Sequence, residues 1–205
     1  MIHDIQKFLE VEKNDADVIM VSKWVGHYKT FLQKYKFDDR NQKMFEQVAH
    51  YFALRHAKRE GFTNLSAGLL LFGGVGTGKT HAMRLLSSHF GIEFVEAQEL
   101  AVQYAIGGDK GFSEWVADWK YKELIIDDIG AEREVKHFGN AGIVGEFIGQ
   151  RYNLWTLEGK LTHMTSNLSE EDFIDRYGER TWSRLHEMCG FVSCVGKDAR
   201  RTETP

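Results

Sequence analysis

The chain has 205 residues and a formal net charge of −4 at pH 7; 42% of its residues are hydrophobic and 27% are charged. This length predicts one domain, or one domain with an appendage, and the composition is ordinary for a soluble globular protein. The negative charge argues against an overall basic nucleic-acid binder, although it leaves a local basic patch open.

Several classes of protein are disfavoured by what the sequence lacks. No run approaches the roughly 18 apolar residues of a membrane span, and the N-terminus lacks the basic-then-apolar pattern of a signal peptide. The two cysteines, Cys189 and Cys194, lie in an apolar region and are expected to be buried free thiols. No other Cys or His stands at zinc-like spacing from them, so we expect no structural metal. We therefore expect a cytoplasmic protein that does not bind membranes.

The first part of the chain predicts helices. Apolar residues recur every three or four positions up to about residue 36, which is typical of an amphipathic helix, although Gly26 disfavours one unbroken helix. We expect a helical appendage over residues 1–38, followed by a core over residues 39–205. Lysines are interleaved with the aromatic residues of this segment, at Lys23, Lys29, Lys34 and Lys36. A solvated helix face is favoured over a nucleic-acid or partner-docking face.

A second helix is predicted over residues 42–58, and an apolar strand over residues 67–72. The segment that follows is a phosphate-binding loop of the form Gly-x-x-x-x-Gly-Lys-Thr: Gly73-Gly74-Val75-Gly76-Thr77-Gly78-Lys79-Thr80. A helix over residues 79–90 completes the strand–loop–helix context that this motif requires. Backbone amides and the helix N-terminus would hold the phosphates, and Lys79 would add charge for the β- and γ-phosphates. The Thr80 hydroxyl is a predicted Mg²⁺ ligand, and the next residue, His81, is included among the nucleotide contacts.

A pair of acids follows the third predicted strand. A strand over residues 92–97 is followed by helices over 98–105 and 112–119, separated at Gly107-Gly108. The strand over residues 123–127 then ends in Asp127 and Asp128. In an open α/β sheet, acids at the carboxyl end of a strand lie where ligands bind. Asp127 would hold the Mg²⁺ shell and Asp128 would orient or deprotonate the attacking water. An ordinary Asp-Asp turn is the alternative, which the upstream phosphate loop disfavours.

The last third of the chain predicts two more strands. A helix over residues 141–157 leads to a strand over residues 161–166, directly before Asn167. Ser169 and Asp172 form a predicted capping box for a helix over residues 170–177. A short helix over residues 181–188 and a strand over residues 191–195 precede a charged tail.

Three segments together carry a family resemblance: Leu-Ile-Ile-Asp-Asp-Ile-Gly at 124–130, Thr-His-Met-Thr-Ser-Asn-Leu at 162–168 and Arg-Tyr-Gly-Glu-Arg-Thr-Trp-Ser-Arg-Leu at 176–185. With the phosphate loop, they resemble the AAA+ ATPases, and more narrowly the DnaC/IstB group of helicase loaders and transposition-helper ATPases. The resemblance covers roughly residues 40–201. It implies a three-layer α/β/α fold with a parallel five-stranded sheet in the order 5-1-4-3-2. Because the chain given ends soon after Arg184, no C-terminal lid domain is expected.

The resemblance also implies roles for individual residues. Asn167 would be the polar residue that positions the attacking water near the γ-phosphate. Arg184 would be an arginine finger that reaches into the site of a neighbouring subunit, with Arg180 as the alternative. The implied ligands and partners are ATP or ADP with Mg²⁺, a replicative hexameric helicase, single-stranded DNA and further copies of the chain in the ATP state.

Other functions stay open at this point. A transposition-helper ATPase would share the core but bind duplex DNA and contact a transposase. A small-molecule P-loop kinase would need an arginine-rich lid and an acceptor pocket, and neither is identified. A nucleotide-gated adaptor that scarcely hydrolyses ATP is mildly disfavoured by the intact acids. No stripe is basic enough to predict a DNA path, and Lys197, Arg200 and Arg201 are more simply explained as a charged tail.

Overall fold

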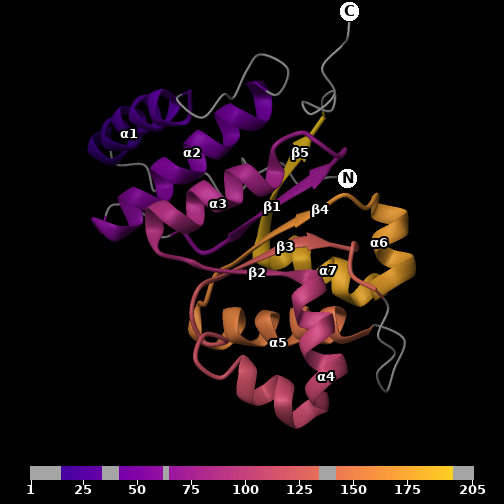
Figure 1. Ribbon diagram of the computed structural model, residues 1–205. Coiled ribbons are helices and arrows are strands. Elements are labelled where there is room, and N and C mark those ends of the chain that lie inside the picture. Colours follow the sequence, from indigo (N-terminus) through magenta and orange to yellow (C-terminus); the bar gives the residue numbers. More distant parts are fainter. Residues whose placement is uncertain (1–14, 34–41, 62–64, 134–141, 196–205) are drawn as a thin grey trace, which may run out of the picture.

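The computed structural model describes residues 15–33, 42–61, 65–133 and 142–195. Five parallel strands form one sheet in the order β2-β3-β4-β1-β5 (Figure 1). The strands are β1 (Gly68–Gly73), β2 (Glu93–Glu96), β3 (Leu124–Ile129), β4 (Thr162–Ser166) and β5 (Cys189–Cys194). The predicted parallel sheet is confirmed. Its strand order is also confirmed, because 5-1-4-3-2 is this same order read from the other edge of the sheet.

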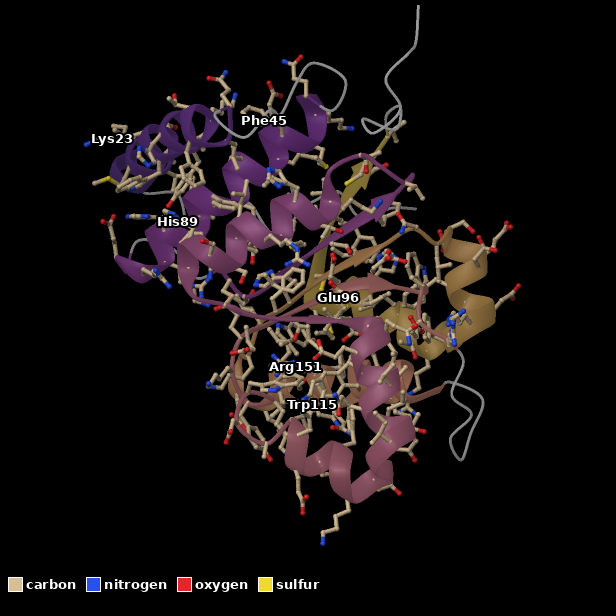
Figure 2. The ribbon with its side chains drawn as sticks, in the orientation of Figure 1. Lys23, Phe45, His89, Glu96, Trp115 and Arg151 are labelled. Atoms are coloured by element: carbon tan, nitrogen blue, oxygen red, sulfur yellow. The ribbon has the colours of Figure 1, made fainter. Side chains whose placement is uncertain are left out.

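Helices cover both faces of this sheet and make a three-layer sandwich (Figure 1). One layer contains α1 (Asp15–Gln33), α2 (Gln42–Arg59) and α3 (Lys79–Phe90), and the other contains α4 (Ala97–Trp115), α5 (Gly142–Glu158), α6 (Glu170–Tyr177) and α7 (Glu179–Met188). Figure 2 shows Phe45 and His89 in the first layer, and Trp115 and Arg151 in the second. Because side chains alternate along a strand, Leu69 and Leu71 join the core under α1–α3, whereas Leu70 joins the core on the other side.

The boundaries of several elements differ from the sequence-based expectation. The two helices expected over residues 98–105 and 112–119 are joined in one element, α4, which ends at Trp115 and is kinked where Gly108 has φ 59° and ψ −162°. Glycine adopts this backbone conformation readily because it has no Cβ atom. The kink therefore lies at Gly107-Gly108, where the sequence predicts a break. Gly26 does not break α1, which runs from Asp15 to Gln33. The last strand begins at Cys189, earlier than expected, and both cysteines are buried free thiols, as predicted.

The helix α1 packs on α2 and also contacts the far end of α3. The buried hydroxyl of Tyr28 lies 2.9 Å from His56 Nδ1 of α2 and 2.8 Å from His89 Nε2 of α3. Burial raises the pKa of Tyr28 to about 12. The division of the chain at residue 38 stays a prediction, and residues 1–14 and 34–41 lie outside the described part of the chain. None of the described helices is long and apolar enough to cross a membrane.

A largely buried polar network connects α2 to the beginnings of β3 and β4. Arg55 of α2 donates to both carboxylate oxygens of Glu123, which directly precedes β3. The fully buried His163 of β4 accepts from the backbone N–H of Leu69 at 3.2 Å and donates from Nε2 to Glu123 at 2.8 Å. Burial raises the pKa of Glu123, but the hydrogen bonds and charges of His163 and Arg55 outweigh it and lower the pKa to about 2.

This lowered pKa predicts a pH-dependent stability. Ionised Glu123 stabilises the fold fully above its unfolded pKa of 4.5, and the contribution is lost as pH falls toward about 2. The difference in pKa corresponds to roughly 3 kcal/mol at neutral pH. Glu123→Gln should therefore lower the free energy of unfolding at pH 7, and the gap to the wild type should shrink markedly at pH 3. Chemical denaturation at the two pH values measures this gap, and an equal gap at both would contradict the assignment.

The buried Arg151 of α5 lies at this same end of the sheet, where β3 and β4 begin. It is fully buried, and its Nε donates to Thr162 Oγ1 at 2.8 Å. Its two terminal nitrogens donate to the backbone carbonyls of Lys120, Lys122 and Leu161. Burial lowers the pKa of Arg151 to about 10, so the guanidinium stays charged at neutral pH. Arg151 thus satisfies carbonyls of the segments that enter β3 and β4.

Candidate nucleotide-binding and hydrolysis site

The loop between β1 and α3 can be built only with glycine at key positions. Gly73 has φ +129°, and a Cβ atom there would lie 2.6 Å from the carbonyl oxygen of Cys194 in β5. Gly78, directly before α3, has φ +95° and no side chain to cap the helix. The first amides of α3 are therefore left to bind an anion, as the sequence motif predicts.

Three predicted site residues from three separate segments form a hydrogen-bonded chain. Lys79 is only 6% exposed, and its Nζ donates to the carbonyls of Gly73 at 2.8 Å and Gly74 at 2.6 Å. The same Nζ donates to Asn167 Oδ1 at 2.6 Å. Asn167 Nδ2 in turn donates to Asp128 Oδ1 at 2.6 Å. The ends of β3 and β4 thus meet the phosphate loop, which brings a cation, an amide and a carboxylate together.

The two acids of β3 lie in different environments. Asp127 is 3% exposed, and its Oδ1 accepts a hydrogen bond from Thr165 Oγ1 at 2.6 Å. Asp128 is partly exposed and has φ +57°, in the left-handed region. Burial and the neighbouring Asp127 carboxylate raise the pKa of Asp128 above its ordinary value, against the opposing effect of Lys79. A carboxylate with a raised pKa is a stronger base than one in water.

A cavity of about 680 Å³ lies over the loop and the start of α3. Its lining residues are Val75, Gly76, Thr77, Gly78, Lys79, Thr80, His81, Arg84, Asp128 and Asn167. Most of the predicted nucleotide-contacting residues are therefore on one surface. Gly73 and Gly74 do not line the cavity but hold Lys79 through their carbonyls.

The donor atoms predicted for Mg²⁺ are of the right chemical kind. Thr80, which carries a hydroxyl, lines the cavity, whereas the Asp127 carboxylate is buried and is not among the residues that line it. Mg²⁺ prefers oxygen ligands and is commonly held by one or two protein groups together with phosphates and water. Within residues 15–33, 42–61, 65–133 and 142–195, no group of three or more His, Cys, Asp or Glu residues could hold a metal ion. Thr80 and Asp127 therefore suit a Mg²⁺ ion that binds together with the nucleotide.

Comparison with known proteins places the fold. Neither a scan against models of protein families nor a search of curated proteins finds a match. Among solved structures, the DnaC helicase loader is 24% identical, with a TM-score of 0.50 over 72% of this chain and 90% of that chain. DnaI is 17% identical, with a TM-score of 0.51 over 93% of this chain and 94% of that chain. The chain therefore shares the fold of these two proteins.

A replication initiator of greater length shares this fold. DnaA from Aquifex aeolicus, solved with bound AMPPCP, is 19% identical, with a TM-score of 0.55 over 80% of this chain. The match covers 49% of that chain, so about half of DnaA has no counterpart here. The fold of this chain thus resembles those of both helicase loaders and a replication initiator.

The two arginines predicted as candidate fingers lie away from the cavity of their own chain. Arg184 is on α7, with its guanidinium 5.0 Å from the centre of the Tyr152 ring of α5. Neither Arg184 nor the exposed Arg180 is among the described residues that line the cavity. Tyr152 also donates to Glu187 at 2.6 Å, so the ring beneath Arg184 is itself fixed. The structure therefore brings Lys79, Asn167 and Asp128 together but leaves Arg184 on another surface.

Two site features were missed by sequence reasoning. Arg84 lines the cavity, pairs with Glu96 at 3.1 Å and lies over the Phe94 ring at 4.6 Å. Its position one helical turn after Thr80 could have revealed it, because residues four apart share a helix face. The buried Glu132 accepts hydrogen bonds from Arg176 and Gly130 N–H, which orders the segment after β3. Nothing in the local sequence indicates that contact.

Proposed function

We propose that this chain binds ATP with Mg²⁺, hydrolyses it, and acts in DNA replication as a DnaC-like helicase loader. The observation that carries the nucleotide chemistry is the chain of contacts from Lys79 through Asn167 to Asp128 at the mouth of the phosphate-loop cavity. The loader role is supported by fold similarity to DnaC and DnaI over nine-tenths or more of those chains.

Each site residue has a defined task in this proposal. The loop amides and Lys79 bind the phosphates, and Thr80 and Asp127 would hold Mg²⁺, which when bound neutralises phosphate charge. The Asp128 carboxylate takes a proton from the attacking water, or orients it, and Asn167 positions that water near the γ-phosphate. ADP is the product that stays in the loop.

Assembly completes the site in this proposal. Because Arg184 is on α7, away from the chain's own cavity, it would serve the site of a neighbouring copy in the ATP state. A guanidinium there stabilises the charge that spreads over the phosphoryl oxygens. Binding of single-stranded DNA is part of the proposal, because DnaA, which shares the fold, has been solved with AMPPCP and single-stranded DNA. We also infer a cytoplasmic location, where replication proteins of this kind act.

Capture of the partner by an Asp128→Asn variant tests the loader role. Asparagine keeps the size of the side chain and tolerates the positive φ of 57° at this position. The variant should bind ATP but hydrolyse it roughly 100-fold or more slowly, since it lacks the basic carboxylate. Held in the ATP state, it should recover a replicative hexameric helicase from a lysate of the source cell, identified by mass spectrometry.

The control is the double variant Lys79→Ala, Asp128→Asn, which should recover no helicase because it cannot hold ATP. Recovery of a transposase, or of duplex DNA without a helicase, would contradict the loader role and favour the IstB-like transposition helper. The nucleotide assignments would stand in that case.

A further inference from the structure

The strand that carries the two acids is irregular at the acids themselves. Along the β3–β4 ladder, Ile126 pairs with Met164, whereas Ile129 pairs with Ser166, and the register shifts between them. Two residues of β3, Asp127 and Asp128, therefore stand opposite the single residue Thr165 of β4. This is the arrangement of a β-bulge, which is rare in parallel sheets and is common beside active sites.

The bulge determines where the second acid points. In a regular strand, successive side chains point to opposite faces of the sheet, so neighbouring acids would point away from each other. Here the left-handed backbone of Asp128, with φ +57°, redirects the chain after Asp127. Asp128 lines the nucleotide cavity, while Asp127 remains buried beside β4. Such a backbone conformation is unfavourable for a residue with a side chain and needs support from its surroundings.

The hydroxyl of Thr165 supplies that support to both acids. Thr165 is 1% exposed, and its Oγ1 donates to Asp127 Oδ1 at 2.6 Å and accepts from the Asp128 backbone N–H at 2.8 Å. A hydroxyl has one hydrogen to donate and lone pairs to accept with, so a single group satisfies both contacts. The second contact gives the backbone N–H of Asp128 a side-chain acceptor at the register shift.

We propose that Thr165 is a positioning residue that maintains the bulge and aims both acids. It fixes one oxygen of Asp127 and leaves the other oxygen for the cation, and it fixes the backbone from which Asp128 reaches the cavity. The catalytic part of this inference rests on the proposed ATP hydrolysis, whereas the structural part does not. Serine retains the hydroxyl and should replace threonine, but valine, which has nearly the same shape, should not.

Three variants separate positioning from stability. Thr165→Val removes the hydroxyl, Thr165→Ser keeps it, and Thr181→Val removes a different buried hydroxyl, which donates to the Tyr177 carbonyl at 2.8 Å, remote from the acids. For each we would measure thermal unfolding, ATP affinity with Mg²⁺ and with EDTA, and phosphate release. Thr165→Val should keep its affinity in EDTA but lose about tenfold or more of the Mg²⁺-dependent affinity and of kcat. Thr165→Ser should stay within about threefold of the wild type, and Thr181→Val should change only the unfolding temperature.

A readout without nucleotide keeps this inference separate from the proposed function. Hydrogen exchange at the Asp128 amide should quicken about tenfold or more in Thr165→Val and stay protected in Thr165→Ser. If the wild type neither binds ATP nor releases phosphate, the proposed function fails, while the exchange result still decides whether Thr165 holds the bulge. Equal protection of Asp128 in all variants, or equal Mg²⁺-dependent affinity and kcat in the two valine variants, would overturn the role of Thr165.

Discussion

Lys79→Ala is expected to abolish ATP binding at micromolar protein concentrations. Lys79 is 6% exposed, and its ammonium group donates to Gly73 O, Gly74 O and Asn167 Oδ1. Hydrogen bonds to charged groups contribute about 1.5–3 kcal/mol each, so the loss of two such bonds to phosphate weakens affinity roughly 100-fold or more. Calorimetric titration with ATP and Mg²⁺ measures the effect.

The matched control for this variant is Lys58→Ala. Lys58 is also partly buried, and its Nζ donates to the backbone carbonyl of Leu65, but it lies outside the cavity lining. The control should lose some stability and keep its ATP affinity. Tight ATP binding by Lys79→Ala, with an affinity close to that of the control, would show that the phosphate-loop assignment is wrong.

Arg184→Ala is expected to keep ATP affinity and to lose hydrolysis in the assembled state by about 1,000-fold. The reason is that Arg184 does not line its own cavity, so its removal leaves the binding site of the same chain intact. What disappears is the positive charge that a neighbouring copy would place beside the γ-phosphate. The comparison variant is Arg180→Ala, which removes an exposed arginine one turn earlier on the same helix. It should change hydrolysis far less.

Mixing variants tests whether the finger acts between copies. Arg184→Ala subunits have an intact binding site but no finger, and Lys79→Ala subunits have a finger but bind no ATP. Neither should hydrolyse ATP alone, and a mixture should recover part of the activity, because the second variant supplies its finger to the first. Unchanged turnover in Arg184→Ala would contradict the choice of Arg184 as the finger, and no recovery in the mixture would contradict a finger acting in trans.

The parts of the fold that depend on local pattern could be predicted from the sequence. Buried parallel strands are short apolar runs, and the phosphate loop fixes where β1 ends and α3 begins. Asp127, Asp128 and Asn167 follow their strands directly, so their meeting at the carboxyl edge follows from the topology. Their actual hydrogen bonds, from Lys79 through Asn167 to Asp128, agree with that expectation.

The parts that depend on contacts between distant segments could not be predicted. Arg55 and Glu123 are 68 positions apart, and Arg151 is on a helix whose sequence gives no indication that this arginine is fully buried. The bulge at Asp127 and Asp128 could not be predicted from the sequence either, because an apolar run followed by two acids is typical of an ordinary strand end. Thr165 lies in the segment 162–168, which contributes to the family resemblance. Its proposed positioning role can be inferred only from the register between β3 and β4 and from its hydrogen bonds.

We propose that this chain is an ATPase whose site is completed by a second copy. To test this, we would measure phosphate release from ATP per subunit over a wide range of wild-type protein concentrations with Mg²⁺ present. The rate per subunit should be very low in dilute solution, rise with concentration and level off once every site has a neighbour. No release at any concentration, or a rate per subunit that does not change with concentration, would contradict the claim.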